Sequence, residues 1–239
     1  MTFAKTHTIG PVRSRLQRLM RLGRAHGPAR AAYRVVKRLS TLPVVRWCVR
    51  FDLVEVLTAT TDQLGTAGRI PKSLVVERAT DEAELAEYFA RPDLVRERLA
   101  AGDVCLVTRA GGKLGAGVWL RPGPGDYDEN RDELGCTIRF PAGVAWSYDG
   151  KGTRWGAWGA LMARMPAFLD ELALGEVYTL IDYDNQESLA GHRSLGYRRA
   201  GLVGCVALMG LSLTVCVPDG RRWHFAPGYV GKLQFARGR

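Results

Sequence analysis

A short stretch near residue 190 carries polar side chains at spacings that could bind a ligand. Asn185 and Ser188 stand three positions apart at the start of an expected helix, and His192 follows four positions later. Residues three and four apart are neighbours on one helix face, so these side chains would face the same way. Asn and Ser at a helix start can cap it, or can reach amide and phosphate groups of a ligand. The residue types alone leave both interpretations open.

A second stretch with ligand-binding character spans residues 150–159 (GKGTRWGAWG). It is small, basic and glycine-rich, and it precedes an expected long helix that ends near Ala173. Backbone amides and the helix dipole at such a point favour phosphate oxygens. The glycines do not have the spacing of a Walker loop or of a dinucleotide-binding fingerprint. The stretch therefore predicts a phosphate site without assigning it to either of those two classes.

Strands and helices in mixed order would have to position these residues. The order β-α-α-β-β-β-α-β-α-β-β predicts an α/β fold with a mixed, mainly antiparallel sheet flanked by helices. A basic helical extension precedes it. Strands are expected at 73–78, 104–109, 114–121, 134–148 (interrupted at Pro141), 177–182, 200–209, 211–217 and 222–225. Residues 122–133 read as an acidic loop.

The stretch 177–197 resembles the GNAT superfamily of acyl-CoA-dependent N-acyltransferases. That family has an Asn, a small residue three positions on, and Leu-Gly-aromatic at the end of the helix. Asn185, Ser188 and Leu195-Gly196-Tyr197 match this pattern at the expected spacing. The resemblance covers roughly residues 72–217 and is strongest in this stretch.

The family's phosphate loop, Arg/Gln-x-x-Gly-x-Gly/Ala, has no clean counterpart here. One register places Gly150 and Gly152 on the family glycines, with Asp149 where Arg or Gln is usual. The other reads Arg-x-x-Ala-x-Gly from Arg154 to Gly159. We favour the second register, because it lies at a better distance from the helix end at Gly175.

The resemblance implies acetyl-CoA, or another acyl-CoA, as co-substrate, and no metal. It implies transfer of a short acyl group to a primary amine of a small-molecule or macromolecular acceptor. His192 stands where the family often has a Tyr that acts as general acid. The candidate bases are Glu133 and Asp132, or Asp149 acting through a water. Backbone N–H groups near Val144–Ser147 would polarise the thioester. The implied cofactor-binding residues are Val144, Ala145, Trp146, Gly152, Thr153, Arg154, Trp155, Gly156, Ala157, Asn185 and Ser188.

The charge of the chain is divided unevenly. The net charge is +10, and residues 1–50 hold 12 Lys and Arg but no acidic residue. Two expected helices in this part carry apolar residues on one face, and the second has Ala32, Val35, Val36 and Leu39. Residues 12–39 therefore predict an arm that binds an anionic membrane surface or nucleic acid, or else a solvated basic helix that covers the domain.

These patterns divide the chain into four parts. A basic helical arm with an extended segment is expected at 1–57, a linker at 58–71, the GNAT-like domain at 72–217, and a hairpin with a tail at 218–239. The rival to an enzyme is a non-catalytic GNAT-fold binding or scaffold protein that docks to an anionic surface through the arm.

The composition of the chain indicates in which cellular compartment to expect the protein. The five cysteines are scattered without CxxC spacing, which favours a reducing environment and argues against a zinc site. The N-terminus has no apolar signal region, and no apolar run is long enough to span a bilayer. We expect a cytoplasmic protein, either free or peripheral at the inner membrane surface.

Overall fold

The computed structural model gives the chain five helices and twelve strands among the residues that it describes. The described residues are 28–40, 42, 49–64, 71–129, 136–154, 156–208, 211–218, 224–227 and 232–234. The helices are α2 (Pro28–Ser40), α4 (Glu82–Phe89), α5 (Pro92–Ala100), α6 (Ala157–Glu171) and α7 (Gln186–Ser194). The strands are β1 (Val49–Thr60), β2 (Leu74–Ala79), β3 (Val104–Ala110), β4 (Lys113–Pro122), β5 (Gly125–Glu129), β6 (Cys136–Phe140), β7 (Val144–Gly152), β8 (Glu176–Asp182), β9 (Arg198–Leu208), β10 (Leu211–Pro218), β11 (His224–Pro227) and β12 (Lys232–Gln234).

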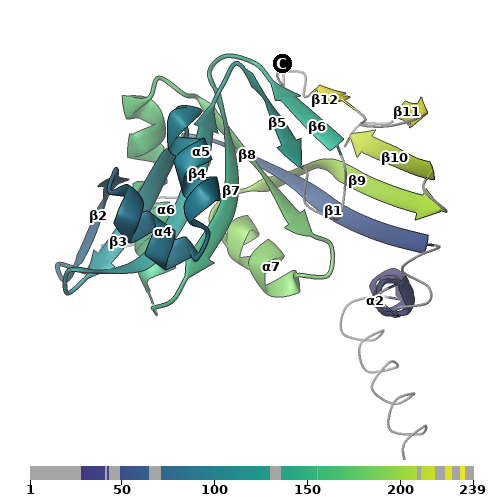
Figure 1. Cartoon of the computed structure of the whole chain (residues 1–239), viewed down its shortest axis with the longest axis horizontal. Coiled ribbons are helices and arrows are strands. Elements are labelled where there is room, and N and C mark those ends of the chain that lie inside the picture. The colour runs from purple at the N-terminus through teal and green to yellow at the C-terminus, as the bar shows by residue number, and fades with distance from the viewer. Residues whose placement is uncertain are drawn as a thin grey trace, which may run out of the picture.

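Within these ranges, one large sheet has the strand order β11-β10-β9-β1-β8-β7-β4-β3-β2. Its neighbours pair antiparallel except β7 and β8, which run parallel (Figure 1). A smaller sheet contains β12, β6 and β5. The predicted fold class, a mixed and mainly antiparallel sheet flanked by helices, is confirmed.

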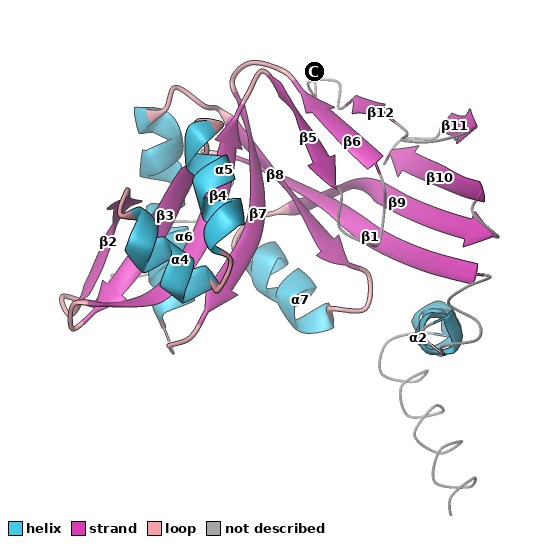
Figure 2. Cartoon of the chain, in the orientation of Figure 1, coloured by secondary structure: helices cyan, strands magenta, loops and turns pink. Residues whose placement is uncertain are grey.

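Helices cover both faces of the large sheet (Figure 2). Leu85 of α4 and Val95 of α5 belong to one buried apolar cluster, and Leu161 of α6 and Leu189 of α7 to a second. Alternate residues of each strand supply the two clusters, because successive side chains in a strand point to opposite faces. The apolar strands are therefore buried on both sides, as their composition requires.

The position of β1 corrects the predicted division of the chain. This strand pairs with β8 on one side and with β9 on the other, and Val56, Leu57 and Ala59 are fully buried. The segment expected to belong to an arm is thus a central strand of the sheet (Figure 1). The expected linker at 58–71 begins inside that strand. A strand can pair with residues distant in sequence, which the local pattern did not reveal.

Other expectations meet mixed outcomes. The second basic helix is confirmed as α2, whereas the first, around residues 12–20, lies outside the described residues. The expected loop at 122–133 contains β5, which pairs with β6. No helix in the described ranges is long and apolar enough to cross a membrane.

Candidate functional site

The parallel strands β7 and β8 diverge beyond their first four paired residues. Their pairing ends at Ser147 and Thr179. After that point β7 continues beside β4, with Tyr148 opposite Trp119, and β8 continues beside β1, with Asp182 opposite Val54. The helices α6 and α7 follow these two diverging ends. The chain therefore has a wedge between two strands, with a helix start on each side of it.

The paired part of β7 does not match its expected role. Val144, Ala145 and Trp146 are at most 1% exposed. Their backbones pair with β8, and those of Ala145 and Trp146 pair with β4 as well. These three residues are therefore part of the closed ladder and core, and their contact with a cofactor stays a prediction. The open part of the strand starts at Tyr148.

The geometry of the turn between β7 and α6 distinguishes the two possible registers of the phosphate motif. β7 extends through Gly152, and α6 begins at Ala157. The backbone N–H groups of Thr153 and Arg154 both donate to the carbonyl of Gly115, at 2.8 and 3.1 Å. Those two amides are engaged by β4, which leaves the helix start itself as the position for an anion.

The glycines around this turn differ in the space above them. A methyl group added at Gly150 would lie 2.5 Å from Cη2 of Trp158, whereas one added at Gly156 or Gly159 would meet nothing within 4 Å. Gly156 precedes α6 with a φ of 77°, which favours glycine. The space at the helix start is open at Gly156 and Gly159 and filled at Gly150, which supports the second register.

The start of α7 shows the expected cap. Oδ1 of Asn185 accepts a hydrogen bond from the backbone N–H of Ser188 at 3.1 Å. The capping interpretation of this pair is thus confirmed, and contact of either residue with a ligand stays a prediction. Leu195 and Gly196 end the helix as expected, and Gly196 has a φ of 97°.

His192 lies on the inner face of α7 among aromatic rings. Its ring centroid is 5.0 Å from that of Tyr197 and 6.2 Å from that of Trp158. Nδ1 donates to the carbonyl of Ser188 at 2.8 Å, since a carbonyl can only accept. Burial lowers the pKa of His192, opposed by this hydrogen bond. The ring is therefore neutral at pH 7, with its hydrogen on Nδ1, and Nε2 can accept a proton but cannot give one.

This state of His192 favours a proton-accepting role over the expected general-acid role, which stays a prediction. A general acid needs a proton to donate near neutral pH, and the one proton on this ring is held by Ser188. The candidate bases Glu133 and Asp132 and the loop residue Trp155 lie outside the described residues. Of the expected catalytic residues, the structure therefore describes His192 and Asp149 alone.

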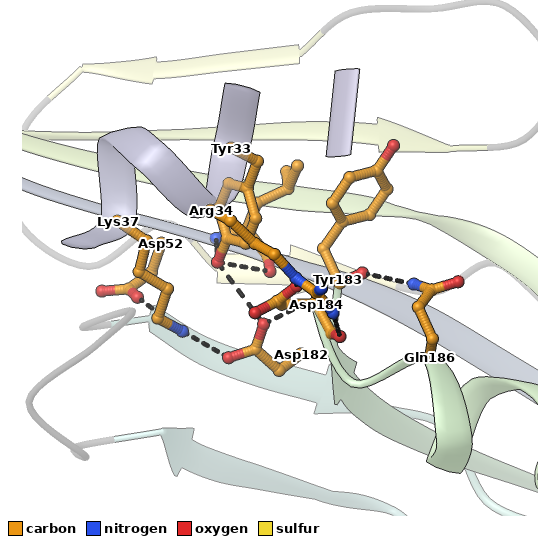
Figure 3. Close-up of polar contacts among 9 residues, drawn as sticks. Tyr33, Arg34, Lys37, Asp52, Asp182, Tyr183, Asp184 and Gln186 are labelled. Carbon is orange, nitrogen blue, oxygen red and sulfur yellow. Dashed lines mark hydrogen bonds and ion pairs between the residues drawn. The ribbon is translucent and has the colours of Figure 1, made fainter. Parts of the chain in front are cut away.

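Helix α2 holds the loop that leads into α7 (Figure 3). Arg34 pairs with Asp184 and Lys37 with Asp182, and Oδ1 of Asp182 accepts the backbone N–H of Asp184. Burial lowers the pKa of Lys37, but the hydrogen bond to Asp182 and the negative charges around the ammonium together outweigh this effect and raise the pKa above its ordinary value. The basic arm thus reaches the site through two ion pairs, a link that no local pattern indicated.

A charge pair with one buried partner joins α7 to the central strand β1. Glu55 of β1 is fully buried, and one of its oxygens accepts from Arg193 of α7 at 2.5 Å. Sequence reasoning missed this residue, although an acidic side chain within the apolar run LVEVL was a visible signal. Buried carboxylates need such partners, because desolvation of an unpaired charge is costly.

A second charged cluster holds the open part of β7. Arg98 of α5 is 5% exposed, pairs with Asp149 and lies over the ring of Tyr148. Asp149 has a φ of 49°, in a region that non-glycine residues rarely occupy. The carboxylate of Asp149 is thus engaged in fixing the bend of the strand at the wedge.

Comparison with known proteins finds only distant structural similarity. No protein-family model matches the sequence, and no curated protein matches it. Similar solved structures include a functionally unknown conserved protein from Staphylococcus epidermidis, with a TM-score of 0.47 and 8% identity over 66% of this chain and 62% of that one. Another is a probable N-acyltransferase from Enterococcus faecalis, with a TM-score of 0.46 and 9% identity over 79% of this chain and 56% of that one.

A third similar structure is a GCN5-related N-acetyltransferase from Kribbella flavida. Its TM-score is 0.42, with 13% identity over 74% of this chain and 63% of that one. This chain thus spans less than two thirds of the length of each of the three. At such low similarity no family, activity or substrate is transferred from these structures to this chain.

Proposed function

We propose that this protein is an acyltransferase that moves an acyl group, acetyl in the first instance, from coenzyme A to a primary amine. The observation that carries the proposal is the wedge between β7 and β8 with an open helix start beside it. The strands separate after Ser147 and Thr179, and the space at Gly156 and Gly159 is open. The pattern from Asn185 to Tyr197 supports the same reaction.

The start of α6 fits the phosphates of coenzyme A in part. A helix N-terminus attracts anions, and the open positions Gly156 and Gly159 allow close approach. Thr153 and Arg154 have their amides engaged by Gly115, so they would contribute little. Bound acyl-CoA would supply a thioester carbonyl, which an amine attacks as the carbon–sulfur bond breaks and the thiolate takes a proton.

Proximity within the wedge would make the largest contribution to rate. When one site holds both reactants, a reaction within one complex replaces the bimolecular encounter. This lowers the activation free energy by up to about 7–11 kcal/mol. His192, neutral and with Nδ1–H bound to Ser188, would accept the proton that the amine loses. Trp158 and Tyr197, which flank its ring, would help to exclude water.

A non-catalytic binding protein is the second candidate. Trp158 covers Gly150 at the open end of β7, and the amides of Thr153 and Arg154 are already bonded. Both features leave less room and fewer free amides for a cofactor, which favours a protein that has the fold but does not catalyse acyl transfer. Absence of acetyl-CoA binding would favour this second candidate.

Calorimetry with acetyl-CoA, together with one pair of variants, tests the proposal. Gly159→Glu places a negative charge at the start of α6 and should weaken acetyl-CoA binding at least about tenfold through repulsion of phosphate. Gly191→Glu is the matched control, since Gly191 is also helical, exposed and without neighbours within 4 Å. If the wild-type chain fails to bind acetyl-CoA, the enzyme proposal is wrong. Equal weakening of acetyl-CoA binding in both variants would show that the phosphates do not bind at the start of α6.

A further inference from the structure

Helix α2 is turned with its charged face toward the protein. Tyr33 is 5% exposed and donates to the carbonyl of Leu53, while Arg34 and Lys37 pair with Asp184 and Asp182 (Figure 3). Most surface helices do the reverse, with apolar residues inward and charges outward. The acidic groups of the body therefore determine which face of this helix is buried.

The opposite face of α2 is apolar and exposed. Val36 is 43% exposed, Leu39 52%, and Leu42, just beyond the helix, 50%. Ala32, Val36 and Leu39 stand at i, i+4 and i+7, so they form one stripe. We call the exposed side chains of Val36, Leu39 and Leu42 together the outer stripe. A contiguous exposed apolar stripe marks a surface that meets a partner.

The charge around the outer stripe indicates the partner's sign. Residues 1–50 hold 12 basic and no acidic residues, whereas the rest of the chain holds 22 basic and 24 acidic ones. An apolar stripe within a purely basic segment fits a surface that is both anionic and apolar just beneath its charges. An anionic lipid bilayer has both properties.

We propose that α2 docks this protein on an anionic membrane surface, with the outer stripe inserted among the lipid headgroups. The ion pairs of Arg34 and Lys37 hold the helix to the body, so binding at α2 brings the end of β8 and the loop before α7 towards the membrane. The docking surface is independent of the proposed acyl transfer, because it shares no residue with the wedge.

Two other partners fit the outer stripe less well. Nucleic acid is bound through cationic side chains, but the outward residues Val36 and Leu39 would present methyl groups to its phosphates. A second copy of the chain would need an interface of about 1,200–2,000 Å², which three partly exposed side chains do not supply.

Co-sedimentation of the full-length protein with vesicles tests the docking surface. We expect binding to vesicles of phosphatidylcholine mixed with phosphatidylglycerol, weaker binding at high salt, and little binding to pure phosphatidylcholine. The variant Val36→Gln/Leu39→Gln removes apolar contact without a change of charge and should weaken binding at least about tenfold. Val75→Gln is the matched control, because Val75 is 53% exposed on β2, far along the sheet from α2. Leu39→Gln alone serves if the double variant does not fold.

Four results would overturn the proposal. The first is a wild-type chain that does not bind anionic vesicles. The second is unchanged vesicle binding in the folded variant, and a fall in its thermal stability would then assign the stripe to another segment of this chain. The third is a wild-type dimer that the same substitutions make monomeric, which would assign the stripe to a second copy. The fourth is binding to duplex DNA that exceeds vesicle binding at equal salt.

Discussion

Helices α6 and α2 are attached to the same sheet by opposite means. Leu161, Met165 and Leu169 of α6 are fully buried against the strands, whereas α2 contacts β1 and the end of β8 through Tyr33 and the ion pairs of Arg34 and Lys37. Apolar burial is strong, tolerant of salt and sensitive to volume. Partly exposed ion pairs are weaker and depend on salt. Helix α6 is thus firmly held, whereas α2 can be released.

The largest effect is expected from a cavity beneath α6. Leu161→Ala should lower the free energy of unfolding by about 2–5 kcal/mol, because a fully buried side chain leaves a void. Leu39→Ala on α2 is the control and should change it by less than about 0.5 kcal/mol, since the residue is half exposed. Urea denaturation measures both. Similar losses in the two variants would mean that α2 is buried by apolar contact after all.

A smaller effect is expected where Trp158 of α6 covers β7. Gly150→Ala should destabilise the protein by about 1–3 kcal/mol, because its new methyl group would overlap the indole. Gly159→Ala should be neutral or stabilising by up to about 1 kcal/mol, as expected for an open helical position. Thermal unfolding compares them. The cost of Gly150→Ala should shrink in a Trp158→Ala background, and a cost that stays the same would reject this contact.

Removal of one ion pair should release α2 and leave α6 in place. Lys37→Met is expected to cost about 1 kcal/mol, a size typical of partly exposed pairs. Hydrogen exchange should rise in α2 and in the loop before α7, and not in α6. Because salt screens such pairs, 1 M NaCl should produce part of the same change in the wild-type protein. Unchanged exchange in α2 would show that Tyr33 and the Arg34–Asp184 pair hold the helix without Lys37.

The smallest effect concerns the pH dependence of the α7 side. The pKa of His192 is lowered by burial, so the unfolded chain binds more protons and stability must fall as pH drops below about 6.5. The stabilising difference is complete above that pH. The decline from pH 7 to pH 5 should be shallower in His192→Gln than in the wild-type protein. Equal slopes in urea titrations would mean that His192 titrates normally.

Much of the fold could be predicted because the elements are locally specified. The hairpin at Val104–Pro122, the helix from Gln186 and its end at Gly196 all follow from apolar alternation, capping and turn residues. The cap formed by Asn185 with Ser188 was predicted for the same reason. The strand β1 was assigned to the wrong unit, because pairing with β8 and β9 depends on residues more than a hundred positions away.

The candidate site could be predicted only in outline. The spacing of Asn185, Ser188 and His192 places them on one helix, but the proton on Nδ1 of His192 depends on the carbonyl of Ser188 and on burial. The cover that Trp158 forms over Gly150 depends on how α6 packs on β7. Residue types indicate which groups are present, and three-dimensional packing sets their protonation and access.

The sequence by itself determined most of the helices and strands, the basic N-terminal segment and the amphipathic pattern of α2. Only the tertiary structure decided that β1 is central, that β7 and β8 separate at Ser147, and that α2 turns its apolar face outward. The physical reason is that helix periodicity defines two faces without stating which is buried. Here Asp182 and Asp184, which are distant in sequence, bind Lys37 and Arg34. These ion pairs determine that the charged face of α2 is the buried one.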